Sequence, residues 1–351
     1  MNQIPLLSLT QSEFTEEIVR RLGKGERHAT LLYSVWIREG GPGDLSWVEP
    51  QAMPLVLQMI DLVQADVSQV SKLLEDGELK KFLLKLSDGY ETESVIIPMK
   101  SGLTLCVSSQ VGCKMGCSFC ETGKMGLIRS LSVQEIIQQL FIAKTLLKAD
   151  IRNIVFMGMG EPFDNYDAVM KAINVMMDPK GFGLGPRHIT VSTSGRAHFI
   201  RRFTYEADPS IHLAVSINAP NDEIRAKIMP VNKESSLKEL KEVLQEYSLG
   251  KKRTILIEYV LLKGVNDALE HADELADYLR GLPVKINLIP YNAQSKARFL
   301  APEEAIQNDF FLRLKARGYP VFLRRHKGRS VMGACGQLGN KAQRLKMYSP
   351  S

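Results

Sequence analysis

Apolar residues follow two alternating patterns between about residues 101 and 324. Short runs rich in Val, Ile and Leu are typical of strands, and stretches with apolar residues every three or four positions are typical of helices. This alternation predicts βαβ units with a parallel sheet, and six or so repeats predict a full or partial (β/α) barrel. The predicted strands are 103–108, 153–157, 188–192, 211–217, 254–262, 284–290 and 319–324, and the predicted helices are 132–147, 165–177, 222–228, 236–247, 267–279 and 302–316.

The first hundred residues show a different pattern. We expect helices over 10–22, with Ser12 as a candidate N-cap, and over 50–74, where a long apolar run keeps a helical period. Two strand-like segments then follow across the turn DGYE. These segments, 79–87 and 93–98, predict a strand pair. The expected organisation is an N-terminal helical accessory domain (1–75), a β extension (76–100) and a core with a basic C-terminal segment (101–351).

Composition places the chain among globular proteins. It has 351 residues, of which 44% are hydrophobic, so it can bury a sizeable core. No apolar stretch reaches the roughly 18 residues that a transmembrane helix needs, and the first residues do not resemble a secretory signal. Five cysteines, an odd number, argue against a secreted disulfide framework. These features predict a cytoplasmic protein without a membrane partner.

Positive charge is concentrated near the C-terminus. The formal net charge is +6, which by itself is weak support for a polyanionic partner. From Val321 onward, however, the chain contains seven Lys and Arg and no Asp or Glu. Such a stretch is either a solvated tail or a surface that contacts phosphates. The basic residues are Arg324, Arg325, Lys327, Arg329, Lys341, Arg344 and Lys346.

Three cysteines stand close together in the segment CKMGCSFC. Cys113, Cys117 and Cys120 have the spacing C-x3-C-x2-C, and glycines around them predict a tightly bent loop. Three thiolates can hold three irons of a four-iron, four-sulfur cluster, which leaves the fourth iron open to a small molecule. A structural zinc site usually has four ligands in two C-x2-C pairs, and no second pair is present. Ordinary buried cysteines are the other alternative.

Polar residues and glycines follow the ends of several predicted strands. The loop GMGEP contains Gly160 and Glu161, whose carboxylate could accept a hydrogen bond from an amino group. Ser192 and Ser216 end two further strands and could bind a nucleoside-like cofactor, and Asn292 could reach an adenine edge. Each of these residues is also a common helix cap or turn residue.

Two cysteines remain outside the cluster of three. Cys106 precedes Cys113 by seven residues, and Cys335 lies in the Gly- and Ala-rich segment SVMGACGQLGN. They are either two buried apolar residues or a pair that forms a transient disulfide during turnover. The loop-like surroundings of Cys335 favour the second interpretation.

Several segments together resemble the RlmN/Cfr family of radical S-adenosylmethionine (SAM) methyltransferases, which act on an adenosine of large-subunit ribosomal RNA. The resemblance covers about residues 90 to 340 and implies a partial (β/α)6 TIM-like radical SAM barrel. The segments are ESVIIP, LCVSSQVGC, GCSFCETGKMGLIR, VFMGMGEP, GFGLGPRHITVSTSG, AVSINAPNDEIRAKIMPVN, IPYN and GACGQL.

The resemblance implies a role for individual residues. Cys335 would be the S-methylcysteine intermediate, Cys106 its resolving partner in a transient disulfide, and Glu93 the proton acceptor. Without the family, Glu93 would be expected on the surface, as most Glu residues are. The implied ligands of a [4Fe-4S] cluster are Cys113, Cys117 and Cys120, and the implied SAM-binding residues are Gly160, Glu161, Ser192, Ser216, Ile217, Asn218 and Asn292.

The family also implies a reaction and partners. One SAM methylates Cys335, and a second, cleaved at the cluster, yields a radical that activates this methyl group for addition to adenine. We expect C2 of an adenosine in 23S rRNA as the target, with transfer RNA as a possible second substrate. Flavodoxin or ferredoxin would donate electrons to a monomeric enzyme. Pro162 resembles the C2-methylating branch, whereas Asn218 departs from the His often found there.

Three alternatives remain open from the sequence. The first is C8 methylation, as in the Cfr branch. The second is a radical SAM enzyme with another RNA or protein acceptor, such as a glycyl-radical activase, which has no need of Cys106 or Cys335. The third is an iron–sulfur or zinc RNA-binding protein that does not consume SAM.

Overall fold

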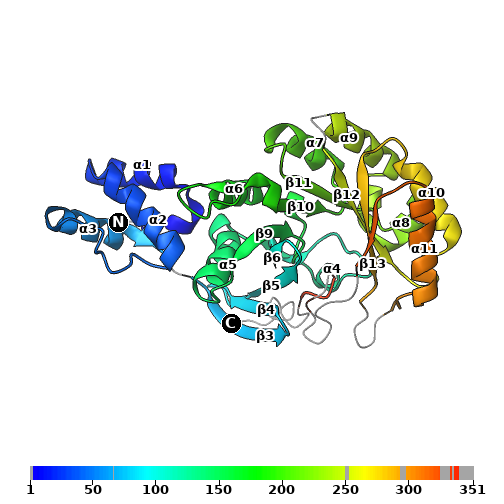
Figure 1. The fold of residues 1–351 in the computed structure, drawn as a ribbon, viewed down its shortest axis with the longest axis horizontal. Helices are drawn as coiled ribbons and strands as arrows, with labels where there is room; N and C mark the ends of the chain where they lie inside the picture. Colours follow the sequence, from blue (N-terminus) through cyan, green and yellow to red (C-terminus); the bar gives the residue numbers. More distant parts are fainter. Residues whose placement is uncertain are drawn as a thin grey trace.

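In the computed structural model, the described residues are 3–65, 67–249, 253–292, 298–324, 333 and 336–339. Within them a ten-stranded sheet forms the centre of the molecule, in the order β14-β13-β12-β11-β10-β9-β6-β5-β4-β3 (Figure 1). The strands from β6 to β14 are parallel, and both β14 and β3 are edges, so the barrel is open. The parallel strands are β6 (Gly102–Cys106), β9 (Ile151–Phe156), β10 (Ile189–Thr193), β11 (His212–Ser216), β12 (Ile255–Leu261), β13 (Val284–Pro290) and β14 (Val321–Leu323).

This arrangement confirms the predicted partial barrel. Each predicted strand of the core is present within a few residues, because short runs of Val, Ile and Leu are buried on both faces of a parallel sheet. Helices follow the strands and cover the outer face (Figure 1). They are α5 (Val133–Thr145), α6 (Tyr166–Met177), α7 (Ala197–Glu206), α8 (Asp222–Ile228), α9 (Leu237–Leu249), α10 (Leu269–Leu279) and α11 (Glu304–Ala316).

Three antiparallel strands extend the sheet beyond β6. The predicted strand pair is confirmed as β4 (Leu79–Lys85) and β5 (Glu91–Met99). The prediction of one helix over 50–74 is wrong, because α3 (Met53–Leu62) ends early and β3 (Gln69–Asp76) follows. The backbone of β3 pairs with β4 in an antiparallel hairpin, and this ladder outweighs the helical period of the sequence.

The N-terminal helices pack against the barrel and share its hydrophobic core. α1 (Gln11–Leu22) and α2 (Glu26–Glu39) contact each other, and Leu6, Leu7 and Phe14 belong to the same buried cluster as the barrel strands. The N-cap of α1 is Thr10 rather than Ser12, and it forms a capping box with Glu13. A short parallel pair, β1 (Ile4–Pro5) and β2 (Val63–Gln64), closes this region.

Three short elements after β6 were not predicted. β7 (Gln110–Cys113) and β8 (Gly126–Ser130) form an antiparallel hairpin, and α4 (Glu121–Met125) lies between them. Five short 3-10 helices are also described, at Leu6–Ser8, Pro50–Ala52, Pro162–Asn165, Pro186–His188 and Pro230–Lys233. None of the described helices combines the length and apolar character that crossing a membrane requires.

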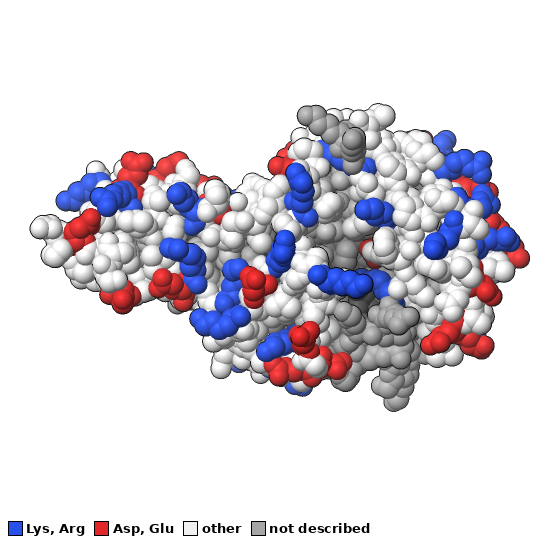
Figure 2. Space-filling view, viewed as in Figure 1, with Lys and Arg blue, Asp and Glu red and all other residues white. Residues whose placement is uncertain are grey.

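Charged side chains are mixed over the face drawn in Figure 2. Lys and Arg are spread from the N-terminal helices to the barrel and are interspersed with Asp and Glu, so this face carries no single continuous basic patch among the described residues. A hollow opens near the middle of the barrel on this face.

Candidate active site

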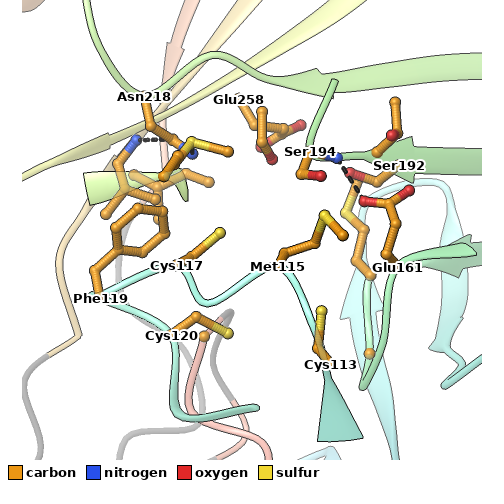
Figure 3. Close-up of a pocket in the computed structure, with 18 of the residues that line it drawn as sticks. Cys113, Met115, Cys117, Phe119, Cys120, Glu161, Ser192, Ser194, Asn218 and Glu258 are labelled. Atoms are coloured by element: carbon orange, nitrogen blue, oxygen red, sulfur yellow. Dashed lines mark hydrogen bonds between the residues drawn. The ribbon is translucent and has the colours of Figure 1, made fainter. Parts of the chain in front are cut away.

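One pocket lies at the carboxyl ends of the parallel strands, where barrel enzymes place their chemistry (Figure 3). It contains about 930 Å³ of space free of atoms, part of which is open to solvent. Its wall combines the predicted cysteine loop with the predicted strand-end residues. Among the lining residues are Cys113, Cys117, Cys120, Gly160, Glu161, Ser192, Ser216, Asn218 and Asn292.

The cysteine loop is built by the β7–β8 hairpin and α4. Cys113 ends β7, and Cys120 is the residue before α4. Gly112 has φ +76°, and a Cβ there would stand 2.0 Å from the Gly126 carbonyl oxygen, so the hairpin can close only with glycine. The Ser118 N–H donates to the Ile228 carbonyl at 2.9 Å and thereby attaches the loop to the end of α8.

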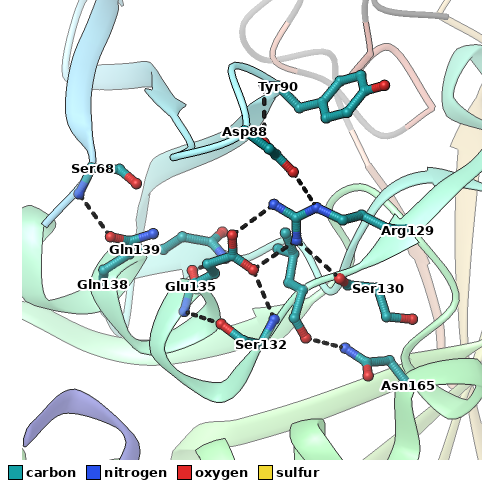
Figure 4. Close-up of polar contacts among 11 residues, drawn as sticks. Ser68, Asp88, Tyr90, Arg129, Ser130, Ser132, Glu135, Gln138, Gln139 and Asn165 are labelled. Carbon is teal, nitrogen blue, oxygen red and sulfur yellow. Dashed lines mark hydrogen bonds and ion pairs between the residues drawn. The ribbon is translucent and has the colours of Figure 1, made fainter. Parts of the chain in front are cut away.

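An arginine attaches the same hairpin to the rest of the protein (Figure 4). Arg129, on β8, donates to Asp88 at 2.5 Å and makes a bidentate contact with Glu135 at 2.7 and 2.8 Å. Asp88 lies in the turn between β4 and β5, and Glu135 lies in the first turn of α5. The guanidinium therefore joins three elements beneath the cysteine loop.

The three thiols face a common space from separate positions (Figure 3). Burial, followed by the charges of the neighbouring thiols and Glu161, raises the pKa of Cys113 and Cys117, and burial also raises the pKa of Cys120. Such thiols stay neutral until a metal deprotonates them. Among the described residues, no three side chains of His, Cys, Asp or Glu are arranged so that they could hold one metal ion. In a four-iron cluster each cysteine binds a different iron, so the three thiols do not have to converge on one ion.

Glu161 follows the glycine turn after β9 and is 3% exposed. Its carboxylate accepts from the backbone N–H groups of Phe163 at 3.1 Å and Ser194 at 2.7 Å. Burial raises the pKa of this carboxyl, and these hydrogen bonds oppose the shift. Gly160 has φ +102°, and a Cβ there would stand 2.6 Å from the Gln110 side chain. The turn thus holds a carboxylate rigidly at the edge of the pocket.

Asn218 lies just after β11 with φ +56°, a left-handed conformation that Asn and His adopt more readily than most residues. Its side-chain oxygen accepts from the Val260 N–H at 2.8 Å, and its side-chain nitrogen contacts the Met229 sulfur at 3.2 Å. The residue is 2% exposed. Asn is therefore a residue type that suits the backbone conformation of this turn.

Of the other predicted cofactor residues, three line the pocket and one does not. Ser192, Ser216 and Asn292 line the pocket at the ends of β10, β11 and β13. Ile217 does not line it, because its side chain is fully buried in the main hydrophobic core. Its backbone N–H donates to the Glu258 carbonyl at 3.1 Å.

The sequence reasoning missed Glu258, which lines the pocket from the middle of β12. The side chain is 4% exposed, and one carboxylate oxygen accepts from the Asn287 amide at 2.8 Å. A charged residue inside the apolar run ILIEYVL, which reads as a buried strand, was a usable signal. The aromatic and Met residues of the wall were also not anticipated; they are Met115, Phe119, Phe156, Met157, Met229 and Tyr291.

Glu93 is buried, contrary to the expectation from composition alone. It is 3% exposed on β5, and its carboxylate forms an ion pair with the buried Lys81 ammonium at 2.7 Å. The other carboxylate oxygen accepts from the Gly339 N–H at 3.1 Å. β4 supplies Lys81 and β5 supplies Glu93, so this buried ion pair lies in the antiparallel extension of the sheet.

The C-terminal segment reaches this same region. Cys106, at the end of β6, packs in a buried cluster that includes Val95, Met159 and Leu338. The Glu121 N–H donates to the Gly336 carbonyl at 2.8 Å, and Gly336 lines the pocket. Cys335 itself lies outside the described residues, as do all the predicted basic residues of the C-terminal stretch except Arg324.

Comparison with known proteins agrees with this geometry. Residues 107–279 match the Radical SAM superfamily. The probable dual-specificity RNA methyltransferase RlmN 1 of Protochlamydia amoebophila is 49% identical, covering 96% of this chain and 94% of that protein. The dual-specificity RNA methyltransferase RlmN of Bdellovibrio bacteriovorus is 44% identical, covering 93% of this chain and 82% of that protein.

A solved structure is also similar over nearly the whole chain. The crystal structure of a radical SAM methyltransferase from Sphaerobacter thermophilus superposes with a TM-score of 0.88 at 36% identity, covering 95% of this chain and 98% of that one. Family, fold and pocket agree on an enzyme that uses a [4Fe-4S] cluster and SAM. The chain belongs to the RlmN/Cfr family of radical SAM RNA methyltransferases.

Proposed function

We propose that the protein methylates C2 of an adenosine in 23S ribosomal RNA, with transfer RNA as a second substrate, through an S-methylcysteine intermediate. The relatives named dual-specificity RNA methyltransferases support more than one RNA substrate. Pro162, which follows Glu161 in the strand-end turn, resembles the C2-methylating branch of the family.

The residues around the pocket fit the two cofactors. Cys113, Cys117 and Cys120 would hold the cluster, and the three-cysteine set leaves one iron free for SAM. The buried Glu161 would accept from the SAM amino group, and the polar strand ends would bind the nucleoside. When bound, this pair supplies a radical that can activate an unreactive methyl group.

The observation that carries the proposal is the convergence of three segments beside the pocket. Glu93 accepts from the Gly339 N–H, and Cys106 packs in one cluster with Leu338, three positions after Cys335. We infer that Cys335 carries the methyl group, that Glu93 accepts the proton lost from the adenine ring carbon, and that the Cys106 thiolate attacks the Cys335 sulfur to release the RNA. Lys81 holds the Glu93 carboxylate in position.

A covalent RNA adduct tests these roles. The anaerobically reconstituted Cys106→Ala variant should accumulate protein bound to labelled RNA through Cys335, visible on a denaturing gel, because the resolving thiol is missing. The Cys335→Ala variant is the matched control and should give no adduct and no methylated RNA. Normal turnover by Cys106→Ala, or an adduct that survives in Cys335→Ala, would contradict the proposed roles.

A further inference from the structure

Glu258 carries a buried carboxylate oxygen that lacks a hydrogen-bond partner among the described residues. The Asn287 amide satisfies Oε1 at 2.8 Å, but Oε2 receives no hydrogen bond. The side chain is 4% exposed, and Figure 3 shows its carboxylate directed into the pocket between Asn218 and Ser194. A buried acceptor left without a donor is destabilising, so the position favours a ligand that donates to it.

The charges around Glu258 do not supply that donor. Burial raises the pKa of this carboxyl, and the Arg324 charge and the Asn287 hydrogen bond oppose the shift. These two groups offset only part of the effect of burial. Arg324 acts on Glu258 through its charge, and Oε2 accepts no hydrogen bond from it.

The position of β12 in the sheet indicates which part of a ligand Glu258 meets. The strands run in the order β9-β10-β11-β12-β13, and Glu258 lies directly opposite Ser216 on β11 and Asn287 on β13. Glu161, proposed to bind the SAM amino group, follows β9, whereas Asn292, proposed to reach adenine, follows β13. A cofactor laid across these strand ends has its ribose between the two, next to Ser216 and Glu258.

We propose that Glu258 binds the ribose of SAM by accepting a hydrogen bond from its 2′- or 3′-hydroxyl through Oε2. Because the 5′ carbon of SAM carries the sulfonium, its nucleoside part has three groups that donate to a carboxylate, namely the two ribose hydroxyls and the adenine amino group. The location between the amino-acid end and the adenine end selects the hydroxyls. This assignment rests on the cofactor placement in the proposed function and adds a specificity-determining residue to it.

The Glu258→Gln variant is a sharp test because Asn287 fixes the amide orientation. The Asn287 amide nitrogen needs an acceptor, so the Gln carbonyl turns toward it and the Gln NH₂ replaces the acceptor in the pocket. Affinity for S-adenosylhomocysteine and its 2′-deoxy, 3′-deoxy and purine (amino-lacking) counterparts would be measured by calorimetry on anaerobic holoenzyme without RNA. Glu303→Gln, a surface change, is the matched control.

The wild-type enzyme should lose about 10- to 100-fold in affinity when the recognised hydroxyl is removed, the range expected of a hydrogen bond to a charged group. Glu258→Gln should bind the parent ligand as weakly as wild type binds that deoxy ligand, and should no longer discriminate between the two. Glu303→Gln should behave as wild type. Equal discrimination in wild type and Glu258→Gln overturns the proposal, and so does selective loss with the purine ligand, which would assign Glu258 to the adenine amino group.

Two further readouts keep the test decisive. Iron content per chain and circular dichroism check that the variant folds and holds its cluster, and Glu258→Asp, which shortens the side chain by one methylene, should give an intermediate loss of discrimination. Binding is measured without RNA. Failure of RNA methylation with intact ribose discrimination would therefore count against the proposed function and leave the Glu258 assignment standing.

Discussion

Replacing Arg225 with Met should loosen the strand ends that form the cofactor pocket. Arg225, on α8, is fully buried and donates to the carbonyl oxygens of Ser194 at 2.6 Å and Ile217 at 3.2 Å and to the Asn232 side chain at 2.9 Å. One guanidinium thus joins the end of β10, the end of β11 and the segment after α8. None of its hydrogen-bond partners among the described residues is a carboxylate.

The size of the effect follows from the two shortest contacts. Hydrogen bonds to a charged group contribute about 1.5 to 3 kcal/mol each, so loss of the contacts to Ser194 and Asn232 alone removes about 3 to 6 kcal/mol. Domains are typically stable by only about 5 to 15 kcal/mol. Lys, with one ammonium in place of a five-donor fork, should recover only part of this loss.

Urea unfolding followed by far-ultraviolet circular dichroism measures the change. Lys227→Met is the matched control on the same helix, because Lys227 is exposed and pairs with the exposed Glu223 one turn away. It should change the unfolding free energy by less than about 1 kcal/mol. Equal, small effects for Arg225→Met and Lys227→Met would refute the idea that the buried guanidinium holds the strand ends together.

Three further changes test other parts of the account. Gly160→Ala forces a Cβ to 2.6 Å from a neighbouring side chain at φ +102°, so calorimetry should show SAM affinity reduced at least tenfold; unchanged affinity would mean that the turn does not shape the pocket. Lys81→Met leaves the Glu93 carboxylate buried and unpaired and should lower the unfolding free energy by about 3 to 5 kcal/mol, much of it regained in the double variant with Glu93→Gln; additive losses would argue against the pair. Burial raises the pKa of Glu135, but hydrogen bonds from Arg129 and the backbone outweigh this and hold it below the usual 4.5. The Arg129–Glu135 pair therefore stabilises the fold above pH 4.5, and this stabilisation is lost as the pH falls through the lowered pKa of Glu135. Between pH 6 and pH 3, the unfolding free energy of Arg129→Met should therefore decrease less than that of the wild type.

The sequence predicted the barrel well because its signal is local. Buried parallel strands are short aliphatic runs, and their order follows from the βαβ alternation. The segment after residue 62 could not be predicted in this way. There the conformation of β3 depends on hairpin pairing with β4, which the apolar period of its own residues does not reveal.

The sequence predicted a site residue correctly where a polar or metal-binding residue type stood at a position that faces the pocket. The cysteine spacing and the polar strand ends led to residues that line one pocket, but Ile217, taken from the family pattern, points its side chain into the core. Glu93 could not be recognised as buried from its own segment, because its partner Lys81 comes from a neighbouring strand. A search of strand ends could not predict Glu258, because the pocket extends down to the middle of β12.

The most direct test of the central claim is nucleoside mass spectrometry of RNA treated with the enzyme. Anaerobically reconstituted protein, SAM and a reductant would be incubated with unmodified ribosomal RNA and, separately, transfer RNA, and the digested nucleosides compared with standards. Methylation at C2 should give a peak of 2-methyladenosine with the wild-type enzyme and no such peak with Cys335→Ala. A peak of 8-methyladenosine would contradict the choice of carbon. No methylated adenosine, with an intact cluster and continued SAM cleavage, would contradict RNA methylation at adenosine altogether.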